Sequence, residues 1–488
     1  MPIMGAGRTA PVAAVIVGAG VAGRLVLEEI RNRPGLNYVV RGFVDDNEAL
    51  HGTVVNGIPV LGGSKDLPRI KDEQAVVEAI IAMPSVRGQS VRKIVDLCRQ
   101  AGLTTQIIPG AIDVLSGRAT VSAARPVGVE DLLRRETLVL ANDVEVHYSG
   151  KIVLVTGAAG TIGSELCRAL AGLNLRRLVL FDTDENGVFD SDLELRSRVA
   201  DMPKAPEVVP VVGSILNEAK VEWLFATYRP DIVFHAAARK HVPMMENHPE
   251  EAVETNVLGT RIVAEKSLAH KVETFVHIST DKAVEPSSVM GATKRLSEVV
   301  VRDLARRSSE TKFVIVRFGN VIGSRSSVFD VFRRQLARGG PITLTHPGMT
   351  RYFMTANEAA VLLLHAVVIG ASGNILSLDM GEPIRIADLA KDLITLSGYR
   401  DEDIEIRFVG PRPGEKLHER LHADDETLVP TRHPRILRVD GVVDPPVSPG
   451  AIERLAQEAR IMDRARIRHA LRDLLPTYRP GFAGNEIL

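Results

Sequence analysis

The sequence predicts an α/β protein with two Rossmann-like doubly wound parallel sheets, the second carrying a C-terminal substrate-binding lobe. Apolar, strand-sized segments alternate with helix-like segments, and two of the strands break on glycines directly into a helix. These openings read AAVIVGAGVAGRLVLEEI near the N-terminus and KIVLVTGAAGTIGSEL from Lys151 to Leu166. The chain has 488 residues, and single hydrophobic cores rarely extend past about 250–300 residues. We therefore expect two or three domains.

The first opening predicts a Rossmann-like, nucleotide-binding-like domain over residues 1–125. Gly18, Gly20 and Gly23 stand at its turn, and the next strand, VVRGFVDD, ends at Asp45 and Asp46. Further strands are predicted at 58–61, 76–82 and 105–108, and a helix at 90–101. The glycines indicate either a bound nucleotide or merely a strand–helix turn. No catalytic motif follows them, so a regulatory or scaffolding role fits this domain better than catalysis.

A charged connector is expected over 126–150, and the second opening begins a longer catalytic unit over 151–488. Its strands are predicted at 151–156, 177–181, 207–212, 231–235, 274–278 and 313–317, and two helices at 251–270 and 291–307. Six parallel strands with right-handed crossovers make a doubly wound sheet over 151–320, whose ligands bind beyond the carboxyl ends of the strands. Past residue 320 the elements become shorter and rich in Gly and Pro. This change predicts a substrate-binding lobe mainly over 321–488.

The second glycine turn has the residues of a dinucleotide site. Gly157 allows a tight turn, Gly160 lets the backbone approach phosphate oxygens, and Gly163 lets the new helix pack on its strand. The helix N-terminus then offers N–H groups and a partial positive charge to the pyrophosphate. Asp182 ends the following strand, where a carboxylate accepts hydrogen bonds from ribose hydroxyls. An acid at this position favours NAD over NADP, whose 2′-phosphate it repels.

Composition excludes several classes of function. The 60 basic and 61 acidic residues nearly cancel, so no electrostatic footprint for nucleic acid appears. Cys98 and Cys167, the two cysteines, each lie in a predicted amphipathic helix, which indicates buried thiols in a reducing compartment. No apolar run approaches the roughly 20 residues that span a bilayer, and the opening MPIMGAGRTAP lacks the core of a signal peptide. We expect a cytoplasmic, soluble chain.

Histidines invite a metal hypothesis that their spacing does not support. His235, His241, His248 and His277 match no ordinary ligand pattern. They are expected to be core or loop residues, and no metal site is predicted.

The segment HISTDKAVEPSSVMGATKR, at the end of the fifth strand of the second unit, concentrates the reactive side chains. It places Thr280, Asp281 and Lys282 at the carboxyl edge of the predicted sheet, with Lys294 on the next helix. Taken alone, the Thr-Asp-Lys group is equally consistent with a solvated turn that holds a local ion pair. Its position at the ligand-binding edge makes it the candidate reactive group.

Six segments together resemble a known family: TGAAGTIGSEL, HAAARKHVPMMENHP, ETNVLGT, STDKAVEPSSVMGATKR, RFGNVIGSRSSVFDVF and GPRPGEKLHE. They are similar to the extended short-chain dehydrogenase/reductases that make 4-keto-6-deoxy sugars. The closest resemblance is to the UDP-N-acetylglucosamine 4,6-dehydratases of bacterial polysaccharide and glycoprotein-sugar synthesis. It covers roughly residues 127–440. Short-chain dehydrogenases usually have a Tyr four residues before the Lys, and the residue here is Met290, as in one branch of this family.

The resemblance also bears on where the chain works. The first domain looks like the nucleotide-binding-like domain that precedes the catalytic unit in longer family members, which usually carry transmembrane helices upstream. We expect a trimmed or naturally soluble version of such a protein, located at the inner face of the membrane if an upstream anchor is missing.

The resemblance implies roles for individual residues. Thr280, Asp281, Lys282 and Lys294 would be catalytic, and Met290 would line the pocket without reacting, because a thioether carries no proton. Residues implied in cofactor binding are Gly157, Gly160, Thr161, Ile162, Gly163, Asp182, Ser214, Ile215, Ala236, Ala237, Ala238, Asn256, Ser279 and Lys294. Ser214 departs from the commoner Asp at the adenine edge. Residues implied in binding a UDP-sugar are Lys240, His241, Asn320, Arg325, Arg351, Arg412, Glu415 and Lys416.

The implied reaction is an NAD-dependent dehydration of UDP-N-acetylglucosamine to UDP-2-acetamido-2,6-dideoxy-4-keto-hexose. Hydride leaves C4, water is lost across C5–C6, and the hydride returns to C6. Lys282 would take the C5 proton as a neutral amine, with Lys294 as the nearby positive charge that makes this form accessible. Asp281 would take the C4 hydroxyl proton, relayed by Thr280, and deliver it to the C6 oxygen. This proton path is a hypothesis.

Two other functions remain open at this point. A nucleotide-sugar C4 epimerase shares the oxidation step, although it normally needs the Tyr that Met290 replaces. A non-catalytic NAD-sensing protein would bind the cofactor without turnover, and Met290 alone favours it, whereas Asp281 and Lys282 weigh against it. Self-association is expected as well, because the helices at 251–270 and 291–307 correspond to those that pair into a four-helix bundle in related dehydrogenases.

Overall fold

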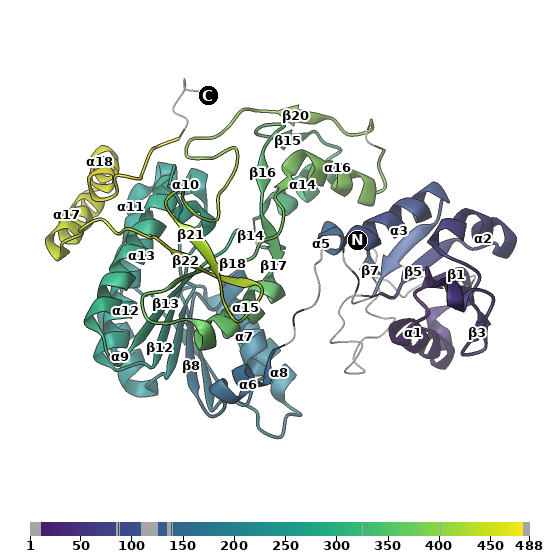
Figure 1. The fold of residues 1–488 in the computed structure, drawn as a ribbon, viewed down its shortest axis with the longest axis horizontal. Helices are drawn as coiled ribbons and strands as arrows, with labels where there is room; N and C mark the ends of the chain where they lie inside the picture. The colour runs from purple at the N-terminus through teal and green to yellow at the C-terminus, as the bar shows by residue number, and fades with distance from the viewer. Residues whose placement is uncertain are drawn as a thin grey trace. The chain divides into compact units, whose positions relative to one another are not determined.

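The computed structural model describes residues 11–481 except 84–85, 87, 109–124, 134–137, 139, 325 and 401. It divides into two compact units, Met1–Thr137 with Thr395–Gly398, and Leu138–Ile394 with Tyr399–Leu488. Each unit contains a mainly parallel sheet covered by helices, as Figure 1 shows, which confirms the predicted α/β class. The expected connector, 126–150, is divided between the units rather than standing apart from both.

The first unit has a five-stranded sheet in the order β2-β1-β5-β6-β7. Its strands are β1 (Val12–Val17), β2 (Tyr38–Val44), β5 (Glu78–Ile81), β6 (Thr104–Ile107) and β7 (Arg125–Pro126), and its main helices are α1 (Val21–Asn32), α2 (Leu67–Gln74) and α3 (Gly88–Gln100). The strand expected at 58–61 is present in part, at Ile58–Pro59, and the adjacent Val60 makes an isolated parallel bridge with Phe43 of β2. Residues of β4 (Ile58–Pro59) form a separate hairpin with β3 (Val54–Val55), which Asn56 and Gly57 join with positive φ angles.

The second unit contains a nine-stranded sheet in the order β10-β9-β8-β11-β12-β13-β18-β22-β21. The six predicted strands correspond to β8 (Ile152–Thr156), β9 (Arg177–Asp182), β10 (Glu207–Val212), β11 (Ile232–His235), β12 (Thr274–Ile278) and β13 (Lys312–Arg317). Three further strands, β18 (Ile375–Leu378), β21 (Thr427–Pro430) and β22 (Ile436–Asp440), extend the sheet from the region predicted as a lobe. The expectation that residues past 320 lie mainly in a separate lobe is therefore wrong for these strands.

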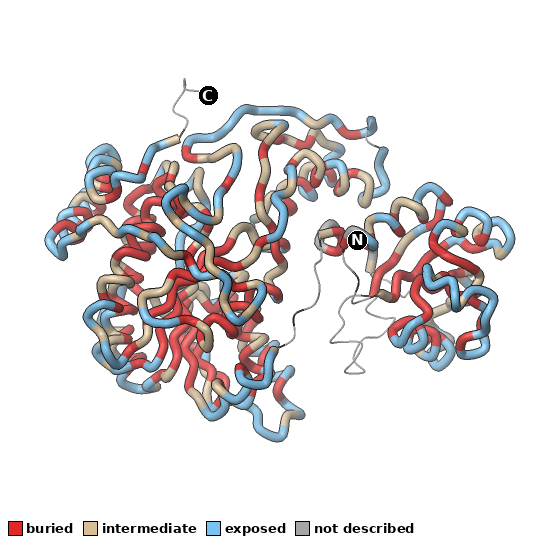
Figure 2. Tube along the Cα trace, in the orientation of Figure 1, coloured by how far each residue is buried: buried red, intermediate tan, exposed pale blue. Residues whose placement is uncertain are grey.

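Side chains alternate between two cores on the faces of the large sheet. Val153, Leu178 and Val314 point into one core, which α6 (Asn142–Tyr148), α7 (Thr161–Ala171), α8 (Glu185–Val199) and α15 (Ala356–Ile369) complete. Leu154 and Val179 point into the other, which α9 (Glu218–Tyr228), α12 (Thr260–Ala269) and α13 (Val289–Arg307) complete. The strands form the buried centre of the unit in Figure 2. Continuous apolar strands are what a sheet buried on both faces requires.

The helix predicted at 251–270 is broken into three parts. It consists of α11 (Pro249–Ala252), a π-helical segment η5 (Val253–Gly259) and α12. A π-helical turn inserts an extra residue into the helical repeat and is common at functional sites. Here it contains Asn256, whose position is described below.

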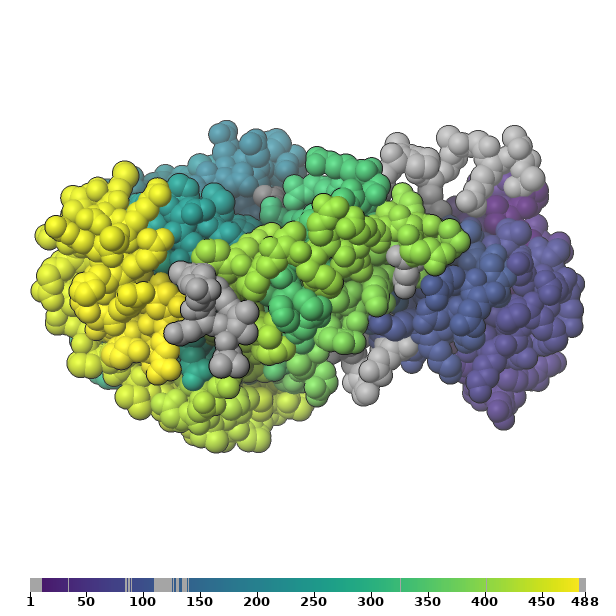
Figure 3. Space-filling view, turned by 90° about the horizontal axis from the view of Figure 1, so that it is seen from above, coloured from purple at the N-terminus to yellow at the C-terminus, as the bar shows by residue number. Residues whose placement is uncertain are grey.

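Two C-terminal helices cover α13 and η5. Leu455 of α17 (Pro449–Arg460) and Leu471 of α18 (Arg464–Leu474) share one apolar cluster with Val257 of η5 and Leu296 of α13. In the space-filling view of Figure 3 these helices, in yellow, form one continuous surface. The face that we expected to pair between subunits is thus occupied by the same chain, and self-association stays a prediction. No helix among the described residues is both long and apolar enough to cross a membrane.

Candidate active site

The carboxyl ends of β8 and β11 mark the point where the strand order reverses. From β8 the chain builds outward to β9 and β10 on one side, and then returns to β11, β12 and β13 on the other. Ligands of doubly wound sheets bind in the crevice at such a switch point. Three cavities open here, and adjacent ones share lining residues.

The first cavity lies at the glycine turn and has a volume of about 280 Å³. Gly157 has φ +70° there, and a Cβ on it would lie 2.5 Å from the backbone N of Ala237. A Cβ on Gly163 would lie 2.0 Å from the carbonyl oxygen of Gly157, so glycine is required at both positions. A Cβ on Gly160, by contrast, would meet only that carbonyl at 3.2 Å, on the lining of the cavity. This is the geometry of a backbone that a phosphate can approach.

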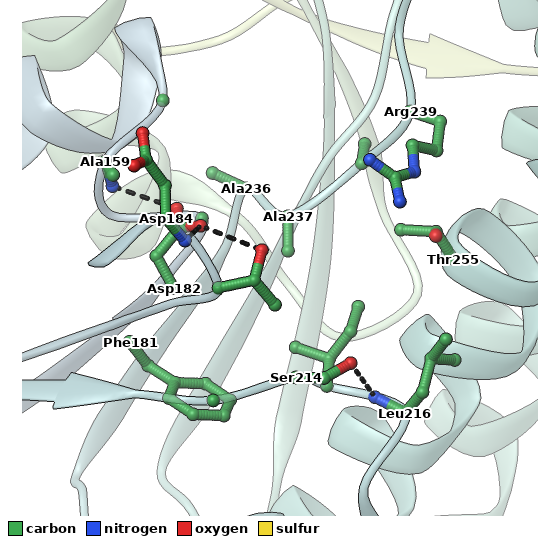
Figure 4. Close-up of a pocket in the computed structure, with 16 residues that line it drawn as sticks. Ala159, Phe181, Asp182, Asp184, Ser214, Leu216, Ala236, Ala237, Arg239 and Thr255 are labelled. Carbon is green, nitrogen blue, oxygen red and sulfur yellow. Dashed lines mark hydrogen bonds between the residues drawn. The ribbon is translucent and has the colours of Figure 1, made fainter. Parts of the chain in front are cut away.

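Asp182 stands at the edge of this cavity, half-buried at the end of β9. Its Oδ2 accepts a hydrogen bond from the backbone N of Ala159 at 3.0 Å, and its Oδ1 accepts one from the backbone N of Asp184 at 3.0 Å. In Figure 4, Arg239 and Thr255 lie across the cavity from this acidic side. The carboxylate therefore fixes the glycine turn and presents a negative charge to the cavity.

The remaining wall comes from the loops after β10 and β11. Ser214, Ile215, Ala236, Ala237 and Ala238 line it. The Ser214 hydroxyl accepts a hydrogen bond from the backbone N of Leu216 at 3.2 Å. These small side chains leave room for a flat ligand between the two loops.

Asn256 is placed behind this wall rather than on it. Its Oδ1 accepts a hydrogen bond from the backbone N of Arg239 at 2.8 Å, and its Nδ2 donates to the Arg239 carbonyl at 3.1 Å and to the Thr293 hydroxyl at 3.0 Å. The side chain is fully buried. Asn256 thus holds the cavity loop in place from the π-helical segment.

The second cavity is the largest of the three, with a volume of about 540 Å³. It continues from the glycine turn to the ends of β12 and β13. Predicted residues that line it are Gly157, Gly160, Thr161, Ile162, Gly163, Ala236, Ala238, Lys240, His241, Ser279, Thr280, Lys282, Met290, Lys294 and Asn320. The glycine turn and the Thr-Asp-Lys segment therefore belong to one continuous cavity.

The three residues of the Thr-Asp-Lys segment do not all face the cavity. Thr280 and Lys282 line it, while Asp281 is fully buried between them and is not among the lining residues. Asp281 Oδ1 accepts hydrogen bonds from the Thr280 hydroxyl at 2.9 Å and from Lys282 Nζ at 2.9 Å. Its Oδ2 accepts no hydrogen bond from any described residue. Lys282 Nζ also donates to Asn320 Oδ1 at 2.9 Å.

Met290 and Lys294 lie on the first turns of α13 and line the same cavity. Lys294 Nζ donates to the carbonyl of Ile278 at 2.7 Å and lies 3.3 Å from Nε2 of His277. Burial lowers the pKa of Lys294 to about 8, against the opposing charge of Glu298. Lys294 is therefore a fixed cation near neutral pH and loses its charge in mildly alkaline solution.

Two of the histidines are core residues, as expected. His235 and His277 stack with ring centroids 5.7 Å apart, and His235 is hydrogen-bonded to the hydroxyls of Thr156 and Thr260. Burial and the charge of Lys294 lower the pKa of His235 to about 3, and also lower that of His277. Both rings are neutral at physiological pH. Among the described residues, no group of three His, Cys, Asp or Glu side chains is placed to hold a metal ion.

A buried ion-pair network holds Ser279, the residue that directly follows β12. Ser279 donates to Glu298 Oε1 at 2.6 Å, and Glu298 accepts from Arg317 Nε at 2.9 Å and Nη2 at 2.8 Å. Arg317 in turn is paired with Glu426 at 2.9 Å. Burial alone would raise the pKa of Glu298, but the charge and hydrogen bonds of Arg317 lower it to about 2.

The third cavity, about 280 Å³, lies on the side of the short C-terminal elements. Predicted residues that line it are Lys240, His241, Lys282, Asn320, Arg351, Arg412, Glu415 and Lys416. Arg325 lies outside the described residues. Arg351 is buried and donates to the carbonyls of Thr350 at 2.7 Å and Lys416 at 2.9 Å, so it shapes the wall. Lys240 and Arg412 are exposed at the cavity.

Glu419 is a lining residue that the sequence interpretation missed. It is buried on the wall of the third cavity, close to Lys282, Lys416 and Arg351. The motif GPRPGEKLHE ends on this residue. The motif could therefore have pointed to Glu419, but nothing in it distinguished this residue from an exposed glutamate in a loop.

A segment after α18 is hydrogen-bonded to two residues that line the third cavity. The backbone N of Gly481 donates to the carbonyl of Ser287 at 2.8 Å, and the backbone N of Gly414 donates to the carbonyl of Gly481 at 3.0 Å. Ser287 and Gly414 both line the cavity. We call residues 476–481 the C-terminal strap.

Comparisons with known proteins agree with this arrangement. The chain matches the family described as polysaccharide biosynthesis protein over residues 153–441, and a CoA-binding domain over residues 6–109. It is 41% identical over 430 residues to the probable polysaccharide biosynthesis protein EpsC of Bacillus subtilis, covering 88% of this chain and 71% of the relative. It is 42% identical over 411 residues to the capsular polysaccharide biosynthesis protein CapD of Staphylococcus aureus, covering 84% and 68%.

Two further similarities each cover somewhat more than half of this chain. The UDP-glucose 4-epimerase of Rickettsia canadensis is 34% identical over 281 residues, which cover 57% of this chain and 80% of the relative. The solved structure of Pen from Bacillus thuringiensis is 31% identical with a TM-score of 0.53, covering 60% of this chain and 88% of that one. Because the family match spans more than half of the sequence and includes every cavity described above, the chain belongs to the polysaccharide biosynthesis protein family.

Proposed function

We propose that this protein dehydrates UDP-N-acetylglucosamine to UDP-2-acetamido-2,6-dideoxy-4-keto-hexose with a resident NAD. The observation that carries the proposal is the hydrogen-bonded Thr280–Asp281–Lys282 group on the cavity that continues from the glycine turn. Elimination of water needs an acid and a base beside the sugar, and this group contains both. Membership of the polysaccharide biosynthesis family supports a nucleotide-sugar substrate.

The residues around the first cavity fit NAD. The open face of Gly160 and the N-terminus of α7 suit a pyrophosphate, and Asp182 suits an adenosine ribose with free hydroxyls. Lys294, which lines the adjoining second cavity, would contact the nicotinamide ribose. When bound, NAD would accept a hydride from C4 of the sugar and return it to C6.

The protein's own groups would move the protons. Thr280 faces the cavity and donates to buried Asp281, so a proton from the C4 hydroxyl would reach Asp281 through Thr280 and later leave by the same path to the C6 oxygen. Lys282 would take the C5 proton after losing one of its own. Its nearest charged neighbours are Asp281 and Glu419, and Lys416 is the lysine coupled to it electrostatically. We therefore propose Lys416, in place of Lys294, as the cation beside Lys282.

Substrate would enter through the third cavity. Lys240 and Arg412 are exposed cations on its lining and are suited to the diphosphate. Asn320, which holds Lys282, stands where the second and third cavities meet, so the sugar ring would lie beside the reactive group.

Incubation of the purified protein with UDP-N-acetylglucosamine tests the proposal by mass spectrometry and NMR. We expect a product lighter than the substrate by one water molecule, with a methyl group at C6 and a ketone at C4. A C4 epimerase is the second candidate, favoured by the similarity to the Rickettsia enzyme. It would give an isomer of unchanged mass. An unaltered substrate would contradict both candidates and would favour an NAD-sensing protein.

Replacing Asp182 with asparagine should weaken NAD binding about tenfold or more and reduce the discrimination against NADP. A charged hydrogen-bond acceptor for the ribose is lost, and so is the negative charge that repels a 2′-phosphate. Calorimetric titration of the variant with each dinucleotide measures both effects. Glu185→Gln, an exposed change on the next turn, should leave both affinities unaltered. An Asp182→Asn protein with the wild-type preference would contradict the assignment.

A further inference from the structure

Glu419 is a buried carboxylate surrounded by cations from three separate segments. Its side chain is 4% exposed on the wall of the third cavity. Its Oε1 lies 3.8 Å from Lys282 Nζ and 4.0 Å from Arg351 Nε, and its Oε2 lies 3.7 Å from Lys416 Nζ. Oε2 accepts no hydrogen bond within the described part of the chain.

These contacts are not those of a stabilising ion pair. Each cation makes its shorter contact elsewhere: Lys282 at 2.9 Å to Asn320, Lys416 at 2.7 Å to the Val284 carbonyl, and Arg351 at 2.7 Å to the Thr350 carbonyl. Burying a carboxylate costs several kcal/mol unless close, hydrogen-bonded partners compensate. A buried polar atom left without a hydrogen bond calls for another explanation, and active sites are where such atoms are found.

We propose that Glu419 is a positioning residue that holds the Lys282 amino group at the cavity and keeps Lys282 and Lys416 from repelling each other. The proposal rests on the proposed role of Lys282 as the base. Burial lowers the pKa of Lys416. The negative charges of Glu419 and Asp281 oppose this shift, and the positive charge of Lys282 adds to it. The two lysines therefore interact unfavourably, and Glu419 is the carboxylate that lies within 4 Å of both.

The charges around Lys282 predict how the loss of Glu419 would affect the Lys282 amino group. Asp281 belongs to the same turn, and Glu419, Lys416 and Arg351 belong to the opposite wall. Glu415 also lines this cavity, but Glu419 is the wall carboxylate within 4 Å of Lys282, Lys416 and Arg351, so its loss leaves these three cations without that shared negative charge. The amine would then release its proton more easily but would be held less firmly in place.

The experiment compares Glu419→Gln with the wild type as full-length protein, using UDP-N-acetylglucosamine and a range of pH. We expect kcat to fall about ten- to a hundredfold, as when an outer partner of a reactive group is removed, with a much smaller change in KM. The low-pH side of the kcat profile should move to lower pH, because a charge that favours the ammonium form is gone. Glu419→Asp should recover part of the rate.

Controls separate this effect from misfolding. Asp424→Asn removes an exposed carboxylate from the same loop, paired with Arg420, and should leave the kcat profile unaltered. NAD affinity of Glu419→Gln should equal that of the wild type. If Glu419→Gln does not fold, the rate and pH profile of Glu419→Asp carry the test. A kcat within twofold of the wild type, or a reduced kcat with an unshifted profile, would overturn the proposal.

The proposed function itself fails in a distinguishable way. If the wild type yields no dehydrated product, both the function and the role of Glu419 fall. If the wild type dehydrates the substrate and the variant behaves identically, the role of Glu419 alone is refuted.

Discussion

Replacing Asp281 with asparagine should reduce kcat by about 10²–10⁴, the usual contribution of a general acid–base group. The Oδ1 atom of Asp281 is the acceptor for both the Thr280 hydroxyl and Lys282 Nζ. An amide in its place cannot take a proton, so both the C4 oxidation and the elimination should stop. The measurement is a stopped-flow record of bound NADH at the start of turnover, followed by the yield of dehydrated product.

Lys282→Ala gives the informative contrast. It removes the proposed base for C5 but leaves the Thr280–Asp281 hydrogen bond, so some tightly bound NADH should still form while the dehydrated product does not. Thr280→Val should resemble Asp281→Asn, because Thr280 is the member of that pair that faces the cavity. A fully active Asp281→Asn enzyme would refute the proton path.

Replacing Glu298 with glutamine should lower the free energy of unfolding of the second unit by about 3–5 kcal/mol. Glu298 is fully buried and accepts two hydrogen bonds from Arg317, which is itself 1% exposed. The neutral amide removes the buried charge that pairs with both Arg317 and Arg295, and leaves them Glu426 and Asp444, respectively, as carboxylate partners. Trp223, the one tryptophan of the chain, lies on α9 in the second unit, so fluorescence during denaturation reports on this unit.

The effect should depend on pH. The pKa of Glu298 in the folded protein, about 2, lies below its ordinary 4.5, so its contribution is present above pH ~4.5 and is lost as the pH falls towards 2. The stability difference between wild type and Glu298→Gln should shrink over that interval. Glu194→Gln, which breaks a half-exposed pair with Arg168, should cost less than about 1 kcal/mol. Equal losses of unfolding free energy for Glu298→Gln and Glu194→Gln would contradict the importance of the buried Glu298–Arg317 network.

The central strands could be predicted because their signals are local. β10 and β12 begin and end where predicted, since each is a short apolar run bounded by polar residues. β18 was missed because ILSL is brief and contains a serine, and its partners β13 and β22 are more than 50 residues away in the sequence. The helix at 251–270 carries one glycine in its π-helical segment, Gly259, but a single glycine is also tolerated inside an α-helix and so did not mark the turn.

The sequence predicted many of the residues that line the candidate cavities, but not which side chains face them. Thr280 is extended and the chain then turns into a short 3-10 helix, Asp281–Ala283, so that Thr280 and Lys282 line the cavity while Asp281 is buried between them. Asn256 was placed on the cofactor and instead holds the loop behind it. Glu419 was missed because its neighbours Lys282 and Arg351 come from distant segments that only the fold brings together.

The C-terminal strap ties two residues that line the proposed substrate cavity to a segment that follows every strand of the large sheet. Gly481 is bonded to Ser287 on one side and to Gly414 on the other. Relatives could therefore widen or narrow the entrance for differently decorated sugars by altering residues 476–481. The proposed proton-transfer group, Thr280–Asp281–Lys282, follows β12 next to Ser279, which is bonded to Glu298 of the Glu298–Arg317 pair. It would be untouched by such changes, so substrate selectivity and chemistry could diverge independently in this architecture.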